Sequence, residues 1–179
     1  MADPTVREFT DSGQPVRLLL PSILHHITDD EDPAGIAAAL RDALPPGSYL
    51  AISSFRMPGP DHPEDAAKAA EMEKLFNEQL GTGRWRDHDE ILAWFGDWEL
   101  VQPGLVPLPE WRPDVRGNIK RNLTYDGFVG GVARTGDRSP GCLALVSPEC
   151  ASRALMYFAG LLRAVSEMVM ERAGFTTLS

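Results

Sequence analysis

Cysteine is scarce in this sequence, since only Cys142 and Cys150 occur among its 179 residues. They form neither a CxxC motif nor a cysteine and histidine spacing of the kind that holds zinc, so a zinc site or a redox centre is not expected. Basic residues are also few, because 17 Lys and Arg stand against 26 Asp and Glu and leave a net charge of -9. A field of this sign repels phosphate backbones and anionic lipids, which excludes nucleic acids and membrane surfaces as expected partners.

Long apolar runs are missing as well. The start of the chain, MADPTVREF, has neither the basic residues nor the apolar stretch of a signal peptide. No stretch reaches the ~18 apolar residues that a membrane-spanning helix needs, since the longest, from Ala154 to Met170, is interrupted by Arg163 and Glu167. We therefore expect a cytoplasmic protein with reduced cysteines.

The clearest pattern that is present is a βαβ unit between Pro15 and Phe55. Residues 16–27 are almost continuously apolar, which is typical of a strand buried on both faces of a parallel sheet. Pro21 interrupts this run. Because proline cannot donate to a sheet ladder, the strand is expected to end or bulge at Pro21, or to lie at an edge. Tyr49 to Phe55 predicts the second strand of the unit.

Three helices are predicted in the first part of the chain, two from their capping residues and one from its apolar side. The Asp32-Pro33 pair predicts an N-cap followed by proline at the first helical position. A longer helix is predicted from Glu64 to Leu80, because alanine and larger apolar residues cover one of its sides. Asp87 with Glu90 is typical of a capping box that opens a short helix.

The second part of the chain predicts two further strands and a final helix. Residues from Trp98 to Val106 and from Tyr125 to Ala133 are the expected strands. An amphipathic helix is predicted from Ser147 to Arg172, since its apolar side chains recur at helical spacing. The expected organisation is a partial α/β domain over residues 1–134 and a C-terminal extension over residues 135–179, whose long helix packs on the same domain.

Three sequence segments, ILHHI with DDEDP, then LRDALPPGSYLAIS, then EILAWFGDWELVQPGLVPLPEWRPD, occur in this order. Together they resemble the C-terminal half of a bacterial family of class I, Rossmann-like, S-adenosylmethionine-dependent methyltransferases, over about residues 15–134. The resemblance implies an incomplete Rossmann-like α/β fold, with a mixed sheet of about four to five strands, flanking helices and an extra C-terminal helix. It also implies methyl transfer from S-adenosylmethionine to a small-molecule acceptor.

One part of the family pattern is missing. The glycine-rich turn that approaches the cofactor, and the acidic residue that binds its ribose, would have to precede Pro15, where Gly13 is the only glycine. The later Gly130-Gly131 pair lies within a predicted strand. We therefore expect a truncated methyltransferase that is weak or inactive alone. The alternative is a non-catalytic α/β module, derived from the same fold, that serves interaction or dimerisation.

The resemblance places a cofactor-binding segment at the end of the first strand, formed by Ser22, Ile23, Leu24, His25 and His26. A histidine at this point is also a candidate catalytic residue, because its unperturbed pKa of about 6.5 suits it to accept a proton from a substrate. Neighbouring side chains on a strand point to opposite faces, so at most one of His25 and His26 is expected to face the pocket. The other is expected to be a loop or packing histidine.

The acidic run that follows the histidines, from Asp29 to Asp32, suggests a metal site at first sight. Calcium loops place their ligands at alternate positions, with a central glycine and a distal glutamate, and this run has neither. We expect a solvated loop that ends in a helix cap, and no metal site.

Without the first strands of the complete fold, residues from Leu18 to Leu24 form an open apolar edge. Such an edge offers unpaired backbone groups to another strand, so we expect it to be covered. Three candidates remain open: the same strand of a second copy in a homodimer, the N-terminal arm around Val6 to Phe9, or the segment from Cys142 to Val146 together with the last helix.

Overall fold

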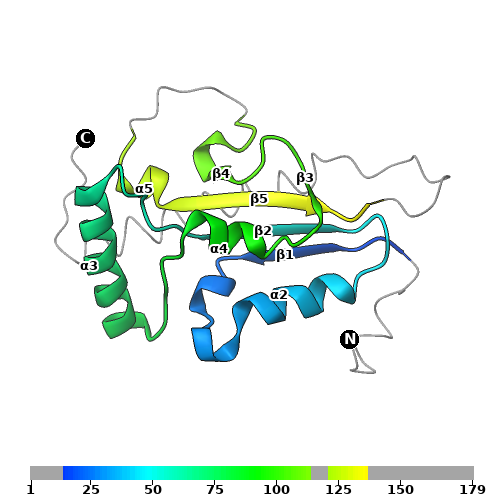
Figure 1. Ribbon diagram of the computed structural model, residues 1–179, viewed down its shortest axis with the longest axis horizontal. Coiled ribbons are helices and arrows are strands. Elements are labelled where there is room, and N and C mark those ends of the chain that lie inside the picture. Colours follow the sequence, from blue (N-terminus) through cyan, green and yellow to red (C-terminus); the bar gives the residue numbers. More distant parts are fainter. Residues whose placement is uncertain (1–13, 114–120, 137–179) are drawn as a thin grey trace.

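The computed structural model describes residues 14–113 and 121–136. The strands form one five-stranded sheet, and the helices pack around it (Figure 1). The strands are β1 (Arg17–Pro21), β2 (Tyr49–Phe55), β3 (Glu99–Leu100), β4 (Val106–Pro107) and β5 (Phe128–Arg134). The helices are α2 (Pro33–Asp42), α3 (Pro63–Leu80), α4 (His88–Ala93) and α5 (Leu123–Asp126), with short 3-10 turns η1 (Leu24–His26), η2 (Asp29–Glu31) and η3 (Leu108–Glu110).

The order of the strands confirms the predicted βαβ unit and the mixed sheet. The strands lie in the order β1, β2, β5, β3, and β4 also pairs with β5. β1 and β2 are parallel, whereas β5 is antiparallel to β2, β3 and β4. β1 is therefore the edge of the sheet in the described part of the chain, as Pro21 indicated.

The two faces of the sheet are packed by different elements. Along β2, Leu50 and Ile52 point to one face, where they join a core with Ile91, Trp94 and Phe95. Ala51 points to the other face, where it joins Leu108, Trp111 and Val132. This alternation follows from the two-residue period of a strand. Helices α2 and α4 cover the first face, and α3 stands beyond the end of the sheet at which β1 and β2 finish (Figure 1).

The predicted helix caps are confirmed. The Asp32 side chain accepts a hydrogen bond of 2.9 Å from the Gly35 N–H and caps α2. Asp87 and Glu90 form the capping box of α4. α3 ends at Gly81, whose φ of 96° is one that glycine adopts readily. Each of these caps depends on residues within one helical turn, so it could be predicted from the sequence alone.

One expected strand boundary is confirmed and two are wrong. β1 ends at Pro21, which is one of the outcomes that the proline predicted, so the apolar residues up to Ile27 do not continue the strand. The expected strand from Trp98 to Val106 is interrupted by a turn at Gly104, whose φ is 95°, and it survives only as β3 and β4. β5 begins at Phe128 instead of Tyr125, because the Asn122 side chain accepts from the Tyr125 N–H and caps α5 there.

Several predictions fall outside the described residues. These are the helix from Ser147 to Arg172, the segment from Cys142 to Val146 and the arm from Val6 to Phe9. The division into residues 1–134 and 135–179 therefore stays a prediction. Within the described ranges, no helix is both long and apolar enough to cross a bilayer.

Candidate functional site

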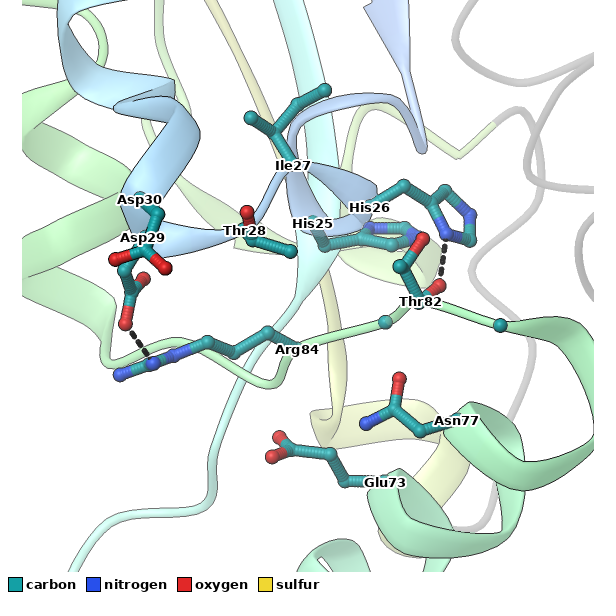
Figure 2. A pocket seen from close by; sticks show the side chains of 12 residues that line it. His25, His26, Ile27, Thr28, Asp29, Asp30, Glu73, Asn77, Thr82 and Arg84 are labelled. Carbon is teal, nitrogen blue, oxygen red and sulfur yellow. Dashed lines mark hydrogen bonds and ion pairs between the residues drawn. The ribbon is translucent and has the colours of Figure 1, made fainter.

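A cavity of about 480 Å³ lies beyond the carboxyl end of β1 (Figure 2). One wall is the exit loop of β1, residues 25–30. A second wall is α3, which contributes Glu73 and Asn77, and residues 81–84 close the space between them. Ligands of open α/β sheets bind outside the carboxyl ends of strands, so this cavity is the candidate functional site.

The exit loop leaves β1 through a strained residue. Ser22 has a φ of 56°, which is uncommon for a residue other than glycine. Its N–H donates to the Ser53 carbonyl oxygen at 3.0 Å, and this bond holds the end of β1 against β2. The Ser22 Oγ is buried and has no hydrogen-bond partner among the described residues. A buried hydroxyl without a partner is costly, and strained residues of this kind cluster at binding sites.

The five residues that the resemblance placed in the cofactor segment have different surroundings in the structure. Leu24 is only 1% exposed and belongs to the hydrophobic core, whereas Ile23 is 47% exposed. His25 and His26 both line the cavity. The expectation that at most one of them faces a pocket is wrong, because they lie in the 3-10 turn η1 and not on a strand.

His25 is a buried, uncharged histidine. It is 1% exposed, and its ring stacks on Phe55 with 4.1 Å between ring centroids. Burial, followed by the nearby His26 and Arg86, lowers the pKa of His25 to about 3. The Phe55 N–H donates a long hydrogen bond of 3.4 Å to Nδ1 of His25. Since Nδ1 accepts, the single ring proton must sit on Nε2, so His25 can donate but cannot accept there.

His26 has the opposite arrangement. Its Nδ1 is hydrogen-bonded to the Thr82 carbonyl oxygen (Figure 2). A carbonyl oxygen only accepts, so Nδ1 of His26 must carry a proton. In the neutral ring the lone pair is then on Nε2. A histidine whose Nδ1–H is held by a backbone carbonyl is oriented to use Nε2 as a base or a ligand.

Residues 82–86, here called the strap, fix the exit loop in place. The Arg84 N–H donates to the His25 carbonyl oxygen at 2.8 Å, which adds to the bond between His26 and Thr82. At the end of β2, the Arg86 N–H donates to the Phe55 carbonyl at 3.3 Å, and the Met57 N–H donates to the Arg86 carbonyl at 2.9 Å. The strap thus joins the exit loop of β1 to the exit of β2.

Arg86 is the buried charge of this region, since it is 3% exposed. Its guanidinium lies 2.9 Å from the Asp29 carboxylate, 3.0 Å from the Ile27 carbonyl oxygen and 3.6 Å from Glu90. It also lies over the ring of Trp94, 5.6 Å from the ring centroid. A buried cation requires partners of this kind, because an unpaired charge in the interior is unstable.

The carboxylates around the cavity differ in whether an arginine pairs with them. Asp29 is neutralised by two arginines, since Arg84 pairs with it as well as Arg86. Asp30 makes no hydrogen bond or ion pair with any described residue, and Glu73 only accepts the Trp85 N–H at 2.7 Å. No group of three or more metal-ligating side chains gathers in residues 14–113 and 121–136. The end of the acidic run serves as the helix cap, through Asp32.

Sequence reasoning missed the residues from elsewhere in the chain that bond to the exit loop, which are Thr82, Arg84 and Arg86, and those that form the opposite wall of the cavity, which are Glu73 and Asn77. The one available signal was the alternation of Arg84, Trp85 and Arg86, which is typical of an extended segment with two faces. That signal indicates neither where the segment lies nor which loop it contacts.

Residues 1–136 match a family model described as S-adenosyl methyltransferase. A candidate methyltransferase from Thermobifida fusca is 32% identical, with a TM-score of 0.64 over 75% of this chain and 48% of its own. A DUF574 family protein from Streptomyces avermitilis is 30% identical, with a TM-score of 0.64 over 74% of this chain and 49% of its own. The chain thus spans about half the length of these two structures. No curated protein matches.

Proposed function

The chain belongs to the S-adenosyl methyltransferase family, and on this premise we propose that its described residues form one wall of a methyl-transfer site at the cavity beyond β1. When bound, S-adenosylmethionine would supply an electrophilic methyl group and would leave as S-adenosylhomocysteine once its bond between sulfur and the methyl carbon is broken. His26 would take up, at Nε2, the proton that the oxygen or nitrogen of the acceptor loses as it is methylated. The observation that carries the proposal is the opposite partner of Nδ1 in the two rings, a backbone N–H for His25 and a backbone carbonyl oxygen for His26.

His25 has the complementary role. Its Nε2–H is a fixed, uncharged donor beside the base, and its low pKa keeps it from taking the proton itself. A donor held in a water-poor site acts more strongly on a polar ligand than one in bulk water. We propose that His25 orients the ligand and that His26 moves the proton.

The described residues fit one side of the cofactor. A nucleoside attached to an amino acid needs hydrogen-bond partners for its hydroxyl, ammonium and carboxylate groups. The Nε2–H of His25, at the end of β1, and the side-chain amide of Asn77, on α3, belong to residues that line the cavity and supply such partners. The described ranges contain no glycine-rich turn between a strand and a helix, so they offer no cradle for the other side. We therefore expect weak methyl transfer by this chain alone, in a cytoplasmic setting.

Calorimetry with S-adenosylmethionine tests the cofactor site directly. Asn77→Ala is expected to weaken binding about fivefold, since Asn77 lines the cavity and a hydrogen bond is worth roughly 1 kcal/mol. It is not expected to destabilise the fold, because the Asn77 side chain bonds to no described residue. Gln79→Ala, an exposed amide of the same helix that does not line the cavity, is the matched control. Absence of both binding heat and protection against thermal unfolding would refute the cofactor site.

The proton transfer is tested by His26→Asn. The asparagine amide can still donate to the Thr82 carbonyl, but it has no basic nitrogen. Cofactor affinity is expected to stay within about twofold, while methyl transfer to any accepted substrate falls about 100-fold or more. His62→Asn, at the exposed start of α3, is the control. A His26→Asn variant with full activity would remove His26 from the reaction.

We also propose that the outer edge of β1, which pairs with no strand in the described part of the chain, pairs with a second copy of the protein. The Tyr49 N–H donates to the Val16 carbonyl and the Ser22 N–H donates to the Ser53 carbonyl. In a parallel ladder this spacing turns the backbone groups of Arg17, Leu19 and Pro21 outward. Leu19 is 40% exposed. Two such edges, antiparallel about Leu19, would exchange hydrogen bonds, with only the proline lacking a donor.

Light scattering at several concentrations tests this pairing. A dimer that becomes monomeric in Leu19→Pro, which removes the central donor of the edge, is the expected result. A monodisperse monomer at every concentration would exclude the homodimer. It would favour cover of the edge by the N-terminal arm or by residues 142–146, the two alternatives within the chain.

A further inference from the structure

The cavity beyond β1 has, on each of its two walls, a carboxylate that pairs with no cation among the described residues. Asp30 stands on the exit loop and Glu73 stands on α3 (Figure 2). The arginine that lines the cavity, Arg84, is already paired with Asp29. Because Arg84 is paired in this way, the remaining charge that the described residues present to a ligand is negative.

The ring of His25 indicates a second chemical group that the ligand carries. His25 lines the cavity, is 1% exposed, and has no described partner for its Nε2. This nitrogen carries the ring proton, since Nδ1 accepts from Phe55. A buried donor that faces a cavity requires an acceptor, either water or a polar atom of the ligand. The ligand therefore carries a hydrogen-bond acceptor near its charged end.

The other lining residues exclude two classes of ligand. Among the described residues, Ile27 is the one large apolar residue that lines the cavity, so a flat aromatic acceptor would find little apolar surface there. An anionic acceptor would meet Asp30 and Glu73, and no cation in the described part of the lining is free to pair with it. The net charge of -9 acts in the same direction, because it raises the local concentration of cations.

We propose that this cavity selects a small polar ligand with an ammonium group, held by Glu73 and Asp30, and with a hydrogen-bond acceptor that meets His25. The proposal rests on the function proposed above, because it names the ligand class of the same site. Both the amino acid end of the cofactor and an amine acceptor have this chemistry. Competition between them decides which of the two occupies the site.

Three small molecules of similar shape but different charge test whether the charge of the ligand determines its binding. Aminobutanol, butanediol and hydroxybutyrate share a hydroxyl at one end and differ at the other, which is positive, neutral or negative. Titration of the full chain, followed by NMR shifts of the cavity residues, detects weak binding. Aminobutanol is expected to bind about tenfold more tightly than butanediol, and hydroxybutyrate not at all. Added salt is expected to weaken the binding of aminobutanol alone.

A matched pair of variants on α3 tests the role of Glu73. Glu73→Gln keeps an oxygen that can accept the Trp85 N–H, so the fold is retained while the charge is lost. Aminobutanol affinity is expected to fall about tenfold. Glu71→Gln, on the exposed side of the same helix, removes the same charge away from the cavity and is expected to leave the affinity unchanged.

The outcomes separate this inference from the proposed function. Equal binding of aminobutanol and butanediol, or an equal loss in Glu71→Gln and Glu73→Gln, would overturn the ammonium site. So would the absence of saturable binding of aminobutanol up to about 10 mM. Binding of aminobutanol without binding of S-adenosylmethionine would support the ammonium site and contradict the methyltransferase proposal. When both bind, displacement of aminobutanol by the cofactor assigns the ammonium site to the cofactor, and simultaneous binding assigns it to the acceptor.

Discussion

The inner and outer sides of the exit loop after β1 carry the same residue type in opposite states. On the inner side His25 is buried against Phe55, accepts a backbone hydrogen bond and is kept neutral. On the outer side His26 is partly exposed and donates from Nδ1 to the Thr82 carbonyl. The difference arises from the turn η1 and the strap, which surround adjacent rings differently. One ring is fixed as a donor, and the other keeps a free basic nitrogen.

The largest expected effect is a loss of folding stability in acid, caused by His25 on the inner side of the exit loop. The ordinary pKa of histidine, 6.5, applies to the unfolded chain, whereas the folded value for His25 is about 3. Between these values the unfolded chain binds the extra proton, so stability is complete above pH 6.5 and is lost as the pH falls toward 3. The full loss amounts to at most about 5 kcal/mol.

His25→Phe isolates this contribution. Near neutral pH the variant is expected to be about 1–2 kcal/mol less stable, because the Phe55 N–H loses its acceptor. Its further loss on acidification is expected to be smaller than that of the wild type, and urea unfolding at about pH 7 and about pH 4 measures both. His88→Gln, an exposed histidine variant, is the control. Parallel acid profiles for wild type and His25→Phe would show that His25 is not the buried neutral group.

The next effect concerns the buried cation that holds the outer part of the loop. Arg86→Met is expected to cost about 2–3 kcal/mol, because it removes charged hydrogen bonds to Asp29 and to the Ile27 carbonyl. Asp29 is half exposed and can be solvated afterwards, which limits the loss. Arg84→Met removes an exposed partner of the same carboxylate and is expected to cost under about 1 kcal/mol. Equal urea midpoints for the two variants would contradict the importance of burial.

A smaller effect concerns the strap itself. A methyl group on Gly83 would lie 2.5 Å from the Phe76 ring, so Gly83→Ala is expected to cost about 1–2 kcal/mol through displacement of the strap or of the ring. The Phe76 ring lies 5.6 Å from that of His26, so the outer side is the side disturbed. Gly59→Ala, with open space around its new methyl group, is the control. A thermally stable Gly83→Ala would show that Phe76 moves aside freely.

The smallest expected effect on stability belongs to the outer histidine. His26→Asn is expected to change the free energy of unfolding by less than about 1 kcal/mol, because it is partly exposed and the amide replaces one hydrogen bond. The large change is expected in methyl transfer alone. If urea unfolding shows a loss as great as that of His25→Phe, the distinction between a buried inner histidine that supports the fold and a partly exposed outer histidine that does not is wrong.

Local signals of the sequence predicted much of this architecture. The Asp32 cap, the Asp87 capping box and the end of α3 at Gly81 each depend on residues within one turn. The parallel pairing of β1 and β2 followed from the length and apolar character of the βαβ unit. Pro21 predicted that the strand ends or bulges there, or lies at an edge, and β1 both ends at Pro21 and lies at the edge of the sheet in the described part of the chain.

The candidate site depends on contacts that no local pattern contains. His25 and His26 meet Thr82 and Arg84, which are more than fifty positions away, and the Glu73 wall comes from another helix. The turn of the chain at Ser22 converts an expected strand into η1, and this changes where both histidines point. Sequence reasoning therefore found the segment of the site but not its partners or its protonation.

Nitrogen-15 NMR of the two imidazole rings tests the central claim most directly, because two-bond proton–nitrogen correlations identify which nitrogen carries the proton. We predict, at about pH 8, where an ordinary histidine is neutral, a proton on Nε2 of His25 and a proton on Nδ1 of His26. On acidification to about pH 5, His25 is predicted to remain neutral. The same tautomer in both rings, or a doubly protonated His25 at that pH, would contradict the division of roles.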